Sequence, residues 1–261
     1  MKRDFLLFFR LFFRLKTLVR QGRFIFFYQP IYDLKTKKVI GVEALMRLKQ
    51  GKNIIAPDRF IPFLEKTGKI KALSDFLLAQ TLSDIKKIHR AGFKNIKLAI
   101  NLSAVQLYQQ ELPDLIAHHL KASNLPHNML ECEITETSFI KNHPVQLDTL
   151  SRLEKTGVSL ALDDFGSGYS SFEYLRKLHI QTLKIDQQFV KTLFDQPNNA
   201  FIVQAILQLG RHLNLTTIAE GIETPKQETW LHRNGCYAGQ GFYFSKPMAL
   251  DDLIAFLKHK K

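Results

Sequence analysis

Short runs of β-type residues alternate with helical segments from about residue 24 onward, and this alternation limits the possible folds more than any other feature. Strands that alternate with helices form mainly parallel sheets, because each helix carries the chain back to the starting edge. The number of runs suits a parallel sheet that closes into a barrel. The runs cover residues 24–32, 39–45, 96–101, 130–135, 158–163, 182–186, 216–220 and 239–244.

The first two runs are joined by the short segment 34–38, which is too short for a crossover helix. They should therefore pair as an antiparallel hairpin. The predicted fold is α/β, a modified TIM-type (β/α)8 barrel with an antiparallel first strand. Apolar residues spaced three and four apart predict a helix over residues 74–89. A second helix is predicted to begin with a capping box formed by Thr224 and Gln227, and to end at Asn234.

The chain has 261 residues and contains no Pro/Gly/Ser-rich linker, which favours a single barrel domain. Its two cysteines, Cys132 and Cys236, have neither the number nor the spacing of a disulfide framework or a zinc site. A reducing, cytoplasmic compartment fits best. Cys132 alternates with Glu131 and Glu133 along its strand, so it should point away from the site.

The formal net charge of +13 implies an anionic partner: a nucleotide, a nucleic acid or a membrane surface. Arginines interleave with aromatics over residues 8–14, a pattern that can stack on bases. Because no fold motif for nucleic-acid recognition accompanies this segment, we expect no nucleic-acid partner. The basic residues also interrupt the apolar stretch near the N-terminus, which argues against a signal peptide or a spanning helix.

Polar residues stand at the carboxyl ends of the predicted strands, where parallel barrels place their active sites. A single carboxylate there often caps a helix instead. Several of them at one barrel mouth would repel one another and need a bound cation. Oxygen ligands suit Mg²⁺ or Mn²⁺, and adjacent aspartates can serve two ions. Lys184 could orient a water or stabilise developing charge. The strand-end set is Glu43, Asn101, Glu133, Asp163, Asp164, Lys184, Asp186 and Glu220.

Over roughly residues 15–257 the sequence resembles the EAL-domain family of cyclic di-GMP phosphodiesterases. The resemblance rests on a series of motifs in order. These are Glu43-Ala44-Leu45 with Arg47, Ile100-Asn101-Leu102-Ser103, Glu133-Ile134-Thr135-Glu136, Asp163-Asp164-Phe165-Gly166 continuing to Ser171, Leu183-Lys184-Ile185-Asp186, Ala219-Glu220-Gly221 and Gly239-Gln240-Gly241.

The resemblance implies roles for individual residues. It places one metal ion on Glu43, Asn101, Glu133 and Asp163, and the second on Asp163, Asp164 and Glu220. Lys184, with Glu220, would act on the hydrolytic water. Glu136 would anchor the loop that follows Asp163. Substrate contacts would come from Gln29, Leu45, Arg47, Asp186, Glu223 and Gln240.

The implied reaction is hydrolysis of cyclic di-GMP to linear 5′-pGpG with two Mg²⁺ or Mn²⁺ ions, and the family also implies a homodimer. Mild departures from the family pattern at Leu48, Ser167, Phe172 and residues 187–188 touch no implied metal ligand. The alternative is a catalytically silent EAL domain that acts as a cyclic di-GMP receptor or a protein-interaction module. Every implied ligand position is filled, which favours catalysis.

Residues 1–19 are predicted to form a basic amphipathic helix that precedes the EAL phosphodiesterase domain, residues 20–261. Arg3, Arg10 and Arg14 lie close together on a helical wheel, opposite a broad face of phenylalanines and leucines. Such a helix suits attachment to an anionic membrane surface, which would place the protein at the periphery of the inner membrane. The alternatives are packing on the barrel, covering of its bottom, or binding of a partner helix.

Overall fold

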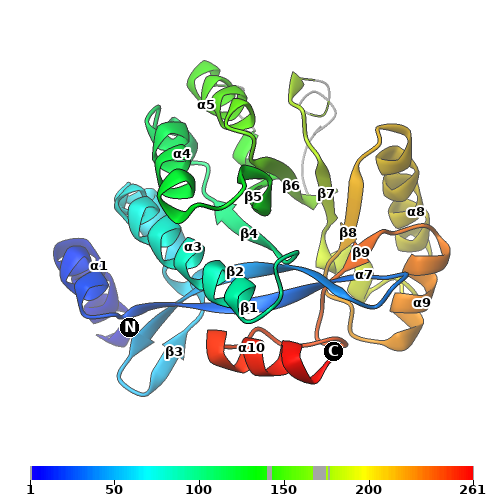
Figure 1. Ribbon diagram of the computed structural model, residues 1–261, viewed down its shortest axis with the longest axis horizontal. Coiled ribbons are helices and arrows are strands. Elements are labelled where there is room, and N and C mark those ends of the chain that lie inside the picture. Colours follow the sequence, from blue (N-terminus) through cyan, green and yellow to red (C-terminus); the bar gives the residue numbers. More distant parts are fainter. Residues whose placement is uncertain (1, 140–142, 167–174, 176, 261) are drawn as a thin grey trace.

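The computed structural model describes residues 2–139, 143–166, 175 and 177–260, and within them an eight-stranded barrel is closed by the pairing of β1 with β2 (Figure 1). The order around the barrel is β1-β9-β8-β7-β6-β5-β4-β2, with the short β3 at the edge of β2. The strands are β1 Phe24–Asp33, β2 Val39–Gln50, β3 Asn53–Ile55, β4 Lys97–Leu102, β5 Leu130–Thr135, β6 Ser159–Phe165, β7 Thr182–Ile185, β8 Thr216–Ala219 and β9 Ala238–Gly239.

Strand β1 is antiparallel to both of its neighbours, β2 and β9, as the short hairpin predicted. In the β1–β2 register Gln29 faces Glu43, so the hairpin brings these two predicted site residues side by side. From β2 through β4, β5, β6, β7 and β8 to β9 every pairing is parallel. The predicted modified barrel with an antiparallel first strand is confirmed.

Helices surround the outside of the barrel (Figure 1). The helix predicted over residues 74–89 is α3, and the capping box of Thr224 and Gln227 begins α9. The α-helices are α1 Lys2–Arg20, α2 Ile61–Lys66, α3 Ser74–Arg90, α4 Leu112–Ser123, α5 Pro144–Lys155, α7 Gln187–Lys191, α8 Pro197–His212, α9 Pro225–Arg233 and α10 Leu250–His259. Short 3-10 turns are η1 Pro57–Arg59, η2 Lys69–Leu73, η3 Gln106–Tyr108, η4 His127–Met129 and η5 Glu136–Phe139.

The core lies between the barrel wall and these helices, and Cys132 is part of it with no exposed surface. This place in the core agrees with the prediction that Cys132 points away from the site. Burial raises the pKa of the Cys132 thiol above its usual range, since an apolar environment disfavours the thiolate.

The last strand is much shorter than predicted, because β9 ends at Gly239 and residues 240–244 form a turn. This turn wraps around Ile222, whose amide donates to the Gln240 carbonyl at 3.1 Å and whose carbonyl accepts from the Tyr243 amide at 3.0 Å. A Cβ at Gly241 would lie 2.1 Å from the Ile222 carbonyl oxygen, so only glycine allows this approach. The turn holds Gln240 at the barrel mouth.

The N-terminal segment forms the predicted helix, α1, with non-helical backbone angles at Arg14. Leu11 and Leu15 are buried in the core that the barrel shares, whereas Phe12 and Phe13 are 40% and 67% exposed. The second half of the helix thus packs on the barrel, which was one of the alternatives to membrane attachment. Among the described residues no helix combines the length and the apolar character that a membrane crossing requires. The division of the chain at residue 19 stays a prediction.

Candidate active site and metal centre

Lys184 occupies the centre of the barrel mouth and has no exposed surface. It comes from β7, and four carboxylates from four other segments lie around it. Its Nζ atom lies 2.7 Å from Glu220 Oε1, 2.8 Å from Glu133 Oε1, 3.3 Å from Asp163 Oδ1 and 3.8 Å from Glu43 Oε2. Four of the strand-end residues that the sequence predicted to converge, Glu43, Glu133, Asp163 and Glu220, therefore lie around one ammonium group.

One lysine does not balance four carboxylates, and the direction of the carboxyl pKa shifts agrees with this imbalance. Burial, followed by repulsion from Glu43, Asp163 and Glu220, raises the pKa of Glu133 well above its usual range despite Lys184. Burial and repulsion from Asp163 and Glu43 likewise raise the pKa of Glu220 to about 8. For Lys184 itself, burial lowers the pKa, but the four carboxylates outweigh burial and hold it well above its usual range. The site therefore has excess negative charge that a cation would stabilise.

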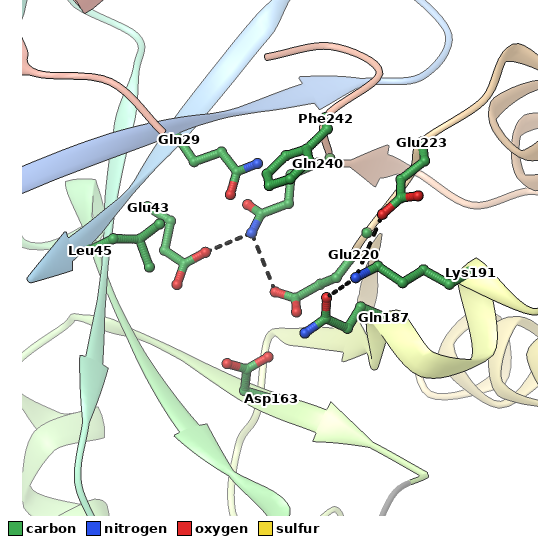
Figure 2. A pocket seen from close by; sticks show the side chains of 12 residues that line it. Gln29, Glu43, Leu45, Asp163, Gln187, Lys191, Glu220, Glu223, Gln240 and Phe242 are labelled. Atoms are coloured by element: carbon green, nitrogen blue, oxygen red, sulfur yellow. Dashed lines mark hydrogen bonds and ion pairs between the residues drawn. The ribbon is translucent and has the colours of Figure 1, made fainter. Parts of the chain in front are cut away.

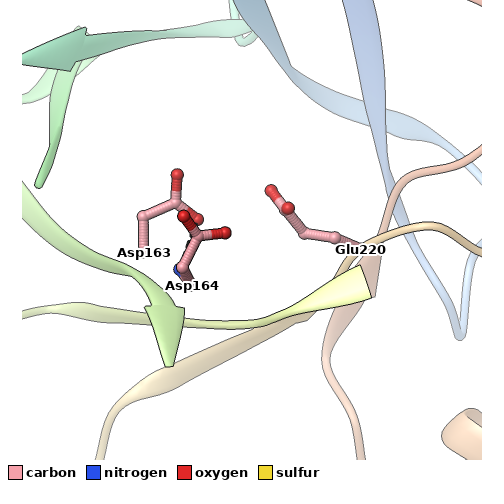
Figure 3. A group of neighbouring side chains, drawn as sticks. All are labelled: Asp163, Asp164 and Glu220. Atoms are coloured by element: carbon pink, nitrogen blue, oxygen red, sulfur yellow. Dashed lines mark hydrogen bonds between the residues drawn. The ribbon is translucent and has the colours of Figure 1, made fainter. Parts of the chain in front are cut away.

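Asp163 and Asp164 present their carboxylates on the same side, although consecutive residues of a strand normally point to opposite faces. The reason is local: Asp164 has a positive φ of 54°, and the β6–β7 register shifts between Leu162 and Phe165. Carboxylate oxygens of Asp163, Asp164 and Glu220 consequently all lie within 4.8 Å of one another (Figure 3). Burial, then repulsion from Asp163 and Asp186, raises the pKa of Asp164 to about 6.

Glu43 is held by two amides, one from β4 on one side of β2 and one from the turn after β9, beyond β1 on the other side. Asn101 Nδ2 donates to Glu43 Oε1 at 2.7 Å, and Gln240 Nε2 donates to Glu43 Oε2 at 2.6 Å. The same Gln240 amide lies 3.4 Å from Glu220 Oε1, so it bridges the two carboxylates (Figure 2). These bonds fix the direction in which both carboxylates face the mouth.

The donor set fits a hard divalent cation. Both side-chain oxygens of Glu133 are buried and lack a hydrogen bond of normal geometry from any described residue, although Lys184 is close to one of them. Buried carboxylate oxygens without such bonds are costly unless a cation coordinates them. The surrounding oxygens come from carboxylates and one amide, the ligand type that hard divalent cations prefer.

A pocket of about 200 Å³ opens beside this centre (Figure 2). The sequence predicted several of its lining residues: Gln29, Glu43, Leu45, Asp163, Glu220, Glu223 and Gln240. It missed Gln187 and Lys191 of α7, and Phe242 of the turn after β9. Lys191 Nζ donates to Gln187 Oε1 at 2.8 Å and lies 3.6 Å from Glu223 Oε1. Lys191 thus adds a cation at the rim, one helical turn beyond Gln187.

Two predicted substrate contacts are not among the residues that line this pocket. Arg47 is half-buried, donates to the Met46 carbonyl at 3.0 Å and lies 5.8 Å from the centroid of the Phe27 ring. Asp186 caps α7, accepting from the Gln188 amide at 2.7 Å. Their roles stay predictions.

Glu136 begins the turn η5, directly after β5, and belongs neither to the carboxylates around Lys184 nor to the Asp163-Asp164-Glu220 group. Its Oε2 atom accepts a hydrogen bond from the Gly166 amide at 3.0 Å, two residues beyond Asp164. This contact fits the predicted role of anchoring the segment that carries the two aspartates. The remainder of the matching motif, from Ser167 to Ser171, lies outside the described residues.

The family model for the EAL domain matches residues 14–247. This chain belongs to the EAL domain family. Among its relatives is the cyclic di-GMP phosphodiesterase NbdA of Pseudomonas aeruginosa, 37% identical over 94% of this chain and 31% of the relative. Another is the bifunctional diguanylate cyclase/cyclic di-GMP phosphodiesterase MucR of the same organism, 36% identical over 92% of this chain and 35% of the relative. The EAL chain thus spans about a third of the length of these two relatives.

Solved structures of EAL domains share the fold. The phosphodiesterase PaMucR in complex with c-di-GMP has a TM-score of 0.88 and 35% identity, covering 94% of this chain and 99% of that chain. The EAL enzyme Bd1971, with cAMP and cyclic di-GMP bound, has a TM-score of 0.91 and 26% identity, covering 98% of this chain and 69% of that chain.

Proposed function

We propose that this EAL domain is a metal-dependent cyclic di-GMP phosphodiesterase that hydrolyses cyclic di-GMP to linear 5′-pGpG. The observation that carries the proposal is the fully buried Lys184 among four carboxylates beside an open pocket. Relatives named as cyclic di-GMP phosphodiesterases support the choice of substrate. In the reaction, water adds to one phosphorus, its bond to the 3′ oxygen breaks, and that oxygen takes up a proton.

The residues that would hold two ions, Mg²⁺ or Mn²⁺, are Glu43, Asn101, Glu133 and Asp163 for one, and Asp163, Asp164 and Glu220 for the other. Bound there, the ions would supply Lewis-acid activation of water and stabilisation of charge on phosphate. Lys184 would orient the attacking water and balance charge through its ammonium group, and Glu220, beside it, would receive a proton from that water.

Substrate would occupy the pocket and contact Gln29, Leu45, Glu223 and Gln240, which line it. Arg47, at the outer part of β2, would bind a phosphate through its guanidinium group, which makes paired hydrogen bonds to such oxygens. Asp186 would complete the rim.

The test is incubation of the purified protein with cyclic di-GMP and Mn²⁺, or Mg²⁺, with products separated by chromatography. We expect pGpG to accumulate with metal and not with excess EDTA. Binding of cyclic di-GMP without pGpG would instead favour the alternative, a silent receptor domain. Neither binding nor turnover would exclude both functions.

Replacing Glu136 by alanine should lower turnover by about 10- to 100-fold, a typical effect of losing a residue that positions metal ligands. The side chain accepts a hydrogen bond from the Gly166 amide, so Glu136→Gln, which keeps an acceptor oxygen, should restore most of the rate. Steady-state rates at several Mn²⁺ concentrations check this. Equal rates in the alanine variant and the wild type would exclude the anchoring role.

We propose further that the protein is a homodimer in the cytoplasm, held at the periphery of the inner membrane by α1. Support for attachment comes from the exposed aromatic pair Phe12 and Phe13 and the exposed cations Arg14 and Lys16. Lys69 adds a further cation, 4.7 Å from the centroid of the Phe12 ring. Light scattering of the purified protein would check the dimer by its mass.

The double variant Phe12→Ser/Phe13→Ser should bind anionic vesicles at least tenfold more weakly than the wild type, since each buried phenylalanine contributes about 1.5–3 kcal/mol. Removal of the whole helix is a poorer test because Leu11 and Leu15 belong to the core. The matched control is Phe201→Ser, which changes a side chain 69% exposed on α8. Equal co-sedimentation of all three proteins would rule out this tether.

A further inference from the structure

A second pocket lies at the end of the barrel opposite the metal centre. It has a volume of about 350 Å³ and is lined by the end of β1, the hairpin turn, the loop between α3 and β4, and the end of α10. Val39 and Ile96 line it just where their strands begin, whereas the metal centre lies where the parallel strands end. The two pockets therefore share no lining residue among the described ones.

Tyr32 lines this pocket and carries a hydrogen-bonding group without a partner. The residue is 1% exposed, and its hydroxyl forms no hydrogen bond to any described residue. Leaving a buried hydroxyl unpaired costs about 1–3 kcal/mol. The ring is held in place by stacking on Phe244, with centroids 4.6 Å apart and 17° between planes. Burial raises the pKa of Tyr32 to about 12, so the hydroxyl keeps its proton and can donate it.

Three lysines at the same pocket carry charge that no acidic group neutralises. Lys38, Lys94 and Lys260 form no ion pair in the described part of the chain, whereas the fourth lysine, Lys37, pairs with Glu228. The Lys260 ammonium lies 5.1 Å from the centroid of the Tyr32 ring. The nearby Asp33 forms no ion pair with these three lysines; its Oδ1 atom accepts hydrogen bonds from the amides of residues 35 and 36 in the hairpin turn.

Exposed lysines are common and by themselves indicate no ligand, but here they line the same pocket as a buried donor without a partner and an apolar wall. We propose that this pocket binds a small phosphorylated molecule, its phosphate oxygens on Lys38, Lys94 and Lys260 and its apolar body against Phe93 and Leu257. The Tyr32 ring lines the same pocket and lies 5.1 Å from the Lys260 ammonium, so its hydroxyl would be a further donor to the bound phosphate. The proposal does not depend on the catalytic function of the barrel.

Isothermal titration of the full chain in EDTA tests the proposal with two probes, inorganic pyrophosphate and GMP. We expect saturable binding, tighter for GMP if the apolar wall is used. Tyr32→Phe, which removes only the hydroxyl, should weaken binding about tenfold, since a hydrogen bond to a charged group contributes roughly this much. The double variant Lys94→Ala/Lys260→Ala should weaken binding at least tenfold and reduce its dependence on salt.

The matched control is Lys191→Ala, which removes the same kind of charge at the pocket beside the metal centre. It should leave the affinity for both probes unchanged. Absence of saturable binding by either probe would overturn the proposal, as would equal affinity of the wild type and the lysine double variant. Loss of binding in Lys191→Ala alone would place the ligand at the other pocket and would equally exclude this one. If Tyr32→Phe binds both probes as tightly as the wild type while the lysine double variant binds them more weakly, the hydroxyl is not part of the site. The lysine contacts to phosphate would then stand without it.

Discussion

Replacing Lys184 by alanine is expected to lower the rate of cyclic di-GMP hydrolysis by about 10³-fold, the usual effect of removing a group that stabilises the transition state. Its ammonium is within 3.3 Å of oxygens from Glu133, Asp163 and Glu220, and no other cation among the described residues is in contact with these oxygens. Water orientation and charge balance at the barrel mouth would therefore be lost together. Product formation at saturating Mn²⁺ measures the effect.

The same substitution leaves buried carboxylates without their partner, which costs about 3–5 kcal/mol for a buried ion pair, so folding must be measured beside activity. Lys184→Met is the second variant, because it fills the volume without the charge. Circular dichroism and cyclic di-GMP binding would show that either variant is folded. A folded variant that hydrolyses the substrate at the wild-type rate would contradict the role of Lys184. Lys191→Ala, which removes a lysine at the rim of the pocket, should lower the rate far less than either Lys184 variant.

The positions of most site residues could be predicted because they follow from the order of the strands. Glu43, Glu133 and Lys184 each lie in or directly after an apolar strand, and a barrel brings such strand ends together. The hairpin could also be predicted, since its connection is too short for a helix, and this pairing sets Gln29 against Glu43. Here local sequence and global fold impose the same arrangement.

Other parts of the site depend on contacts between distant segments, which no local pattern reveals. The shortening of β9 follows from the close approach of Gly241 to Ile222, and β3 is a three-residue extension of the hairpin with no distinct signal. Lys191 reaches the pocket rim because α7 begins immediately after β7. Regular strand alternation would point the side chains of Asp163 and Asp164 to opposite faces of the sheet. The positive φ of Asp164 turns both to the same side.

Replacing Asp164 by asparagine should have opposite effects on stability with and without metal, together with a loss of turnover of the order of 10²-fold or more. Asparagine tolerates a positive φ, so the backbone can stay as it is. In EDTA the variant should be more stable than the wild type, because burial and repulsion from Asp163 and Asp186 disfavour the charged carboxylate and raise its pKa from 3.8 to about 6. A raised acidic pKa destabilises the fold fully above pH 6 and not at all below about pH 3.8, so the advantage should disappear in acid.

With Mn²⁺ present the order should reverse, because metal binding stabilises the folded protein by about 2.7 kcal/mol at a concentration 100 times the dissociation constant, and the variant lacks one ligand. Thermal unfolding at pH 7.5 with EDTA and with Mn²⁺ measures both effects. Glu223→Gln is the matched control, since it removes a carboxylate that lines the same pocket but lies outside the Asp163-Asp164-Glu220 group. It should show no reversal. If the Asp164 variant gains as much stability from Mn²⁺ as the wild type, Asp164 is not a metal ligand, and the second ion must be bound elsewhere.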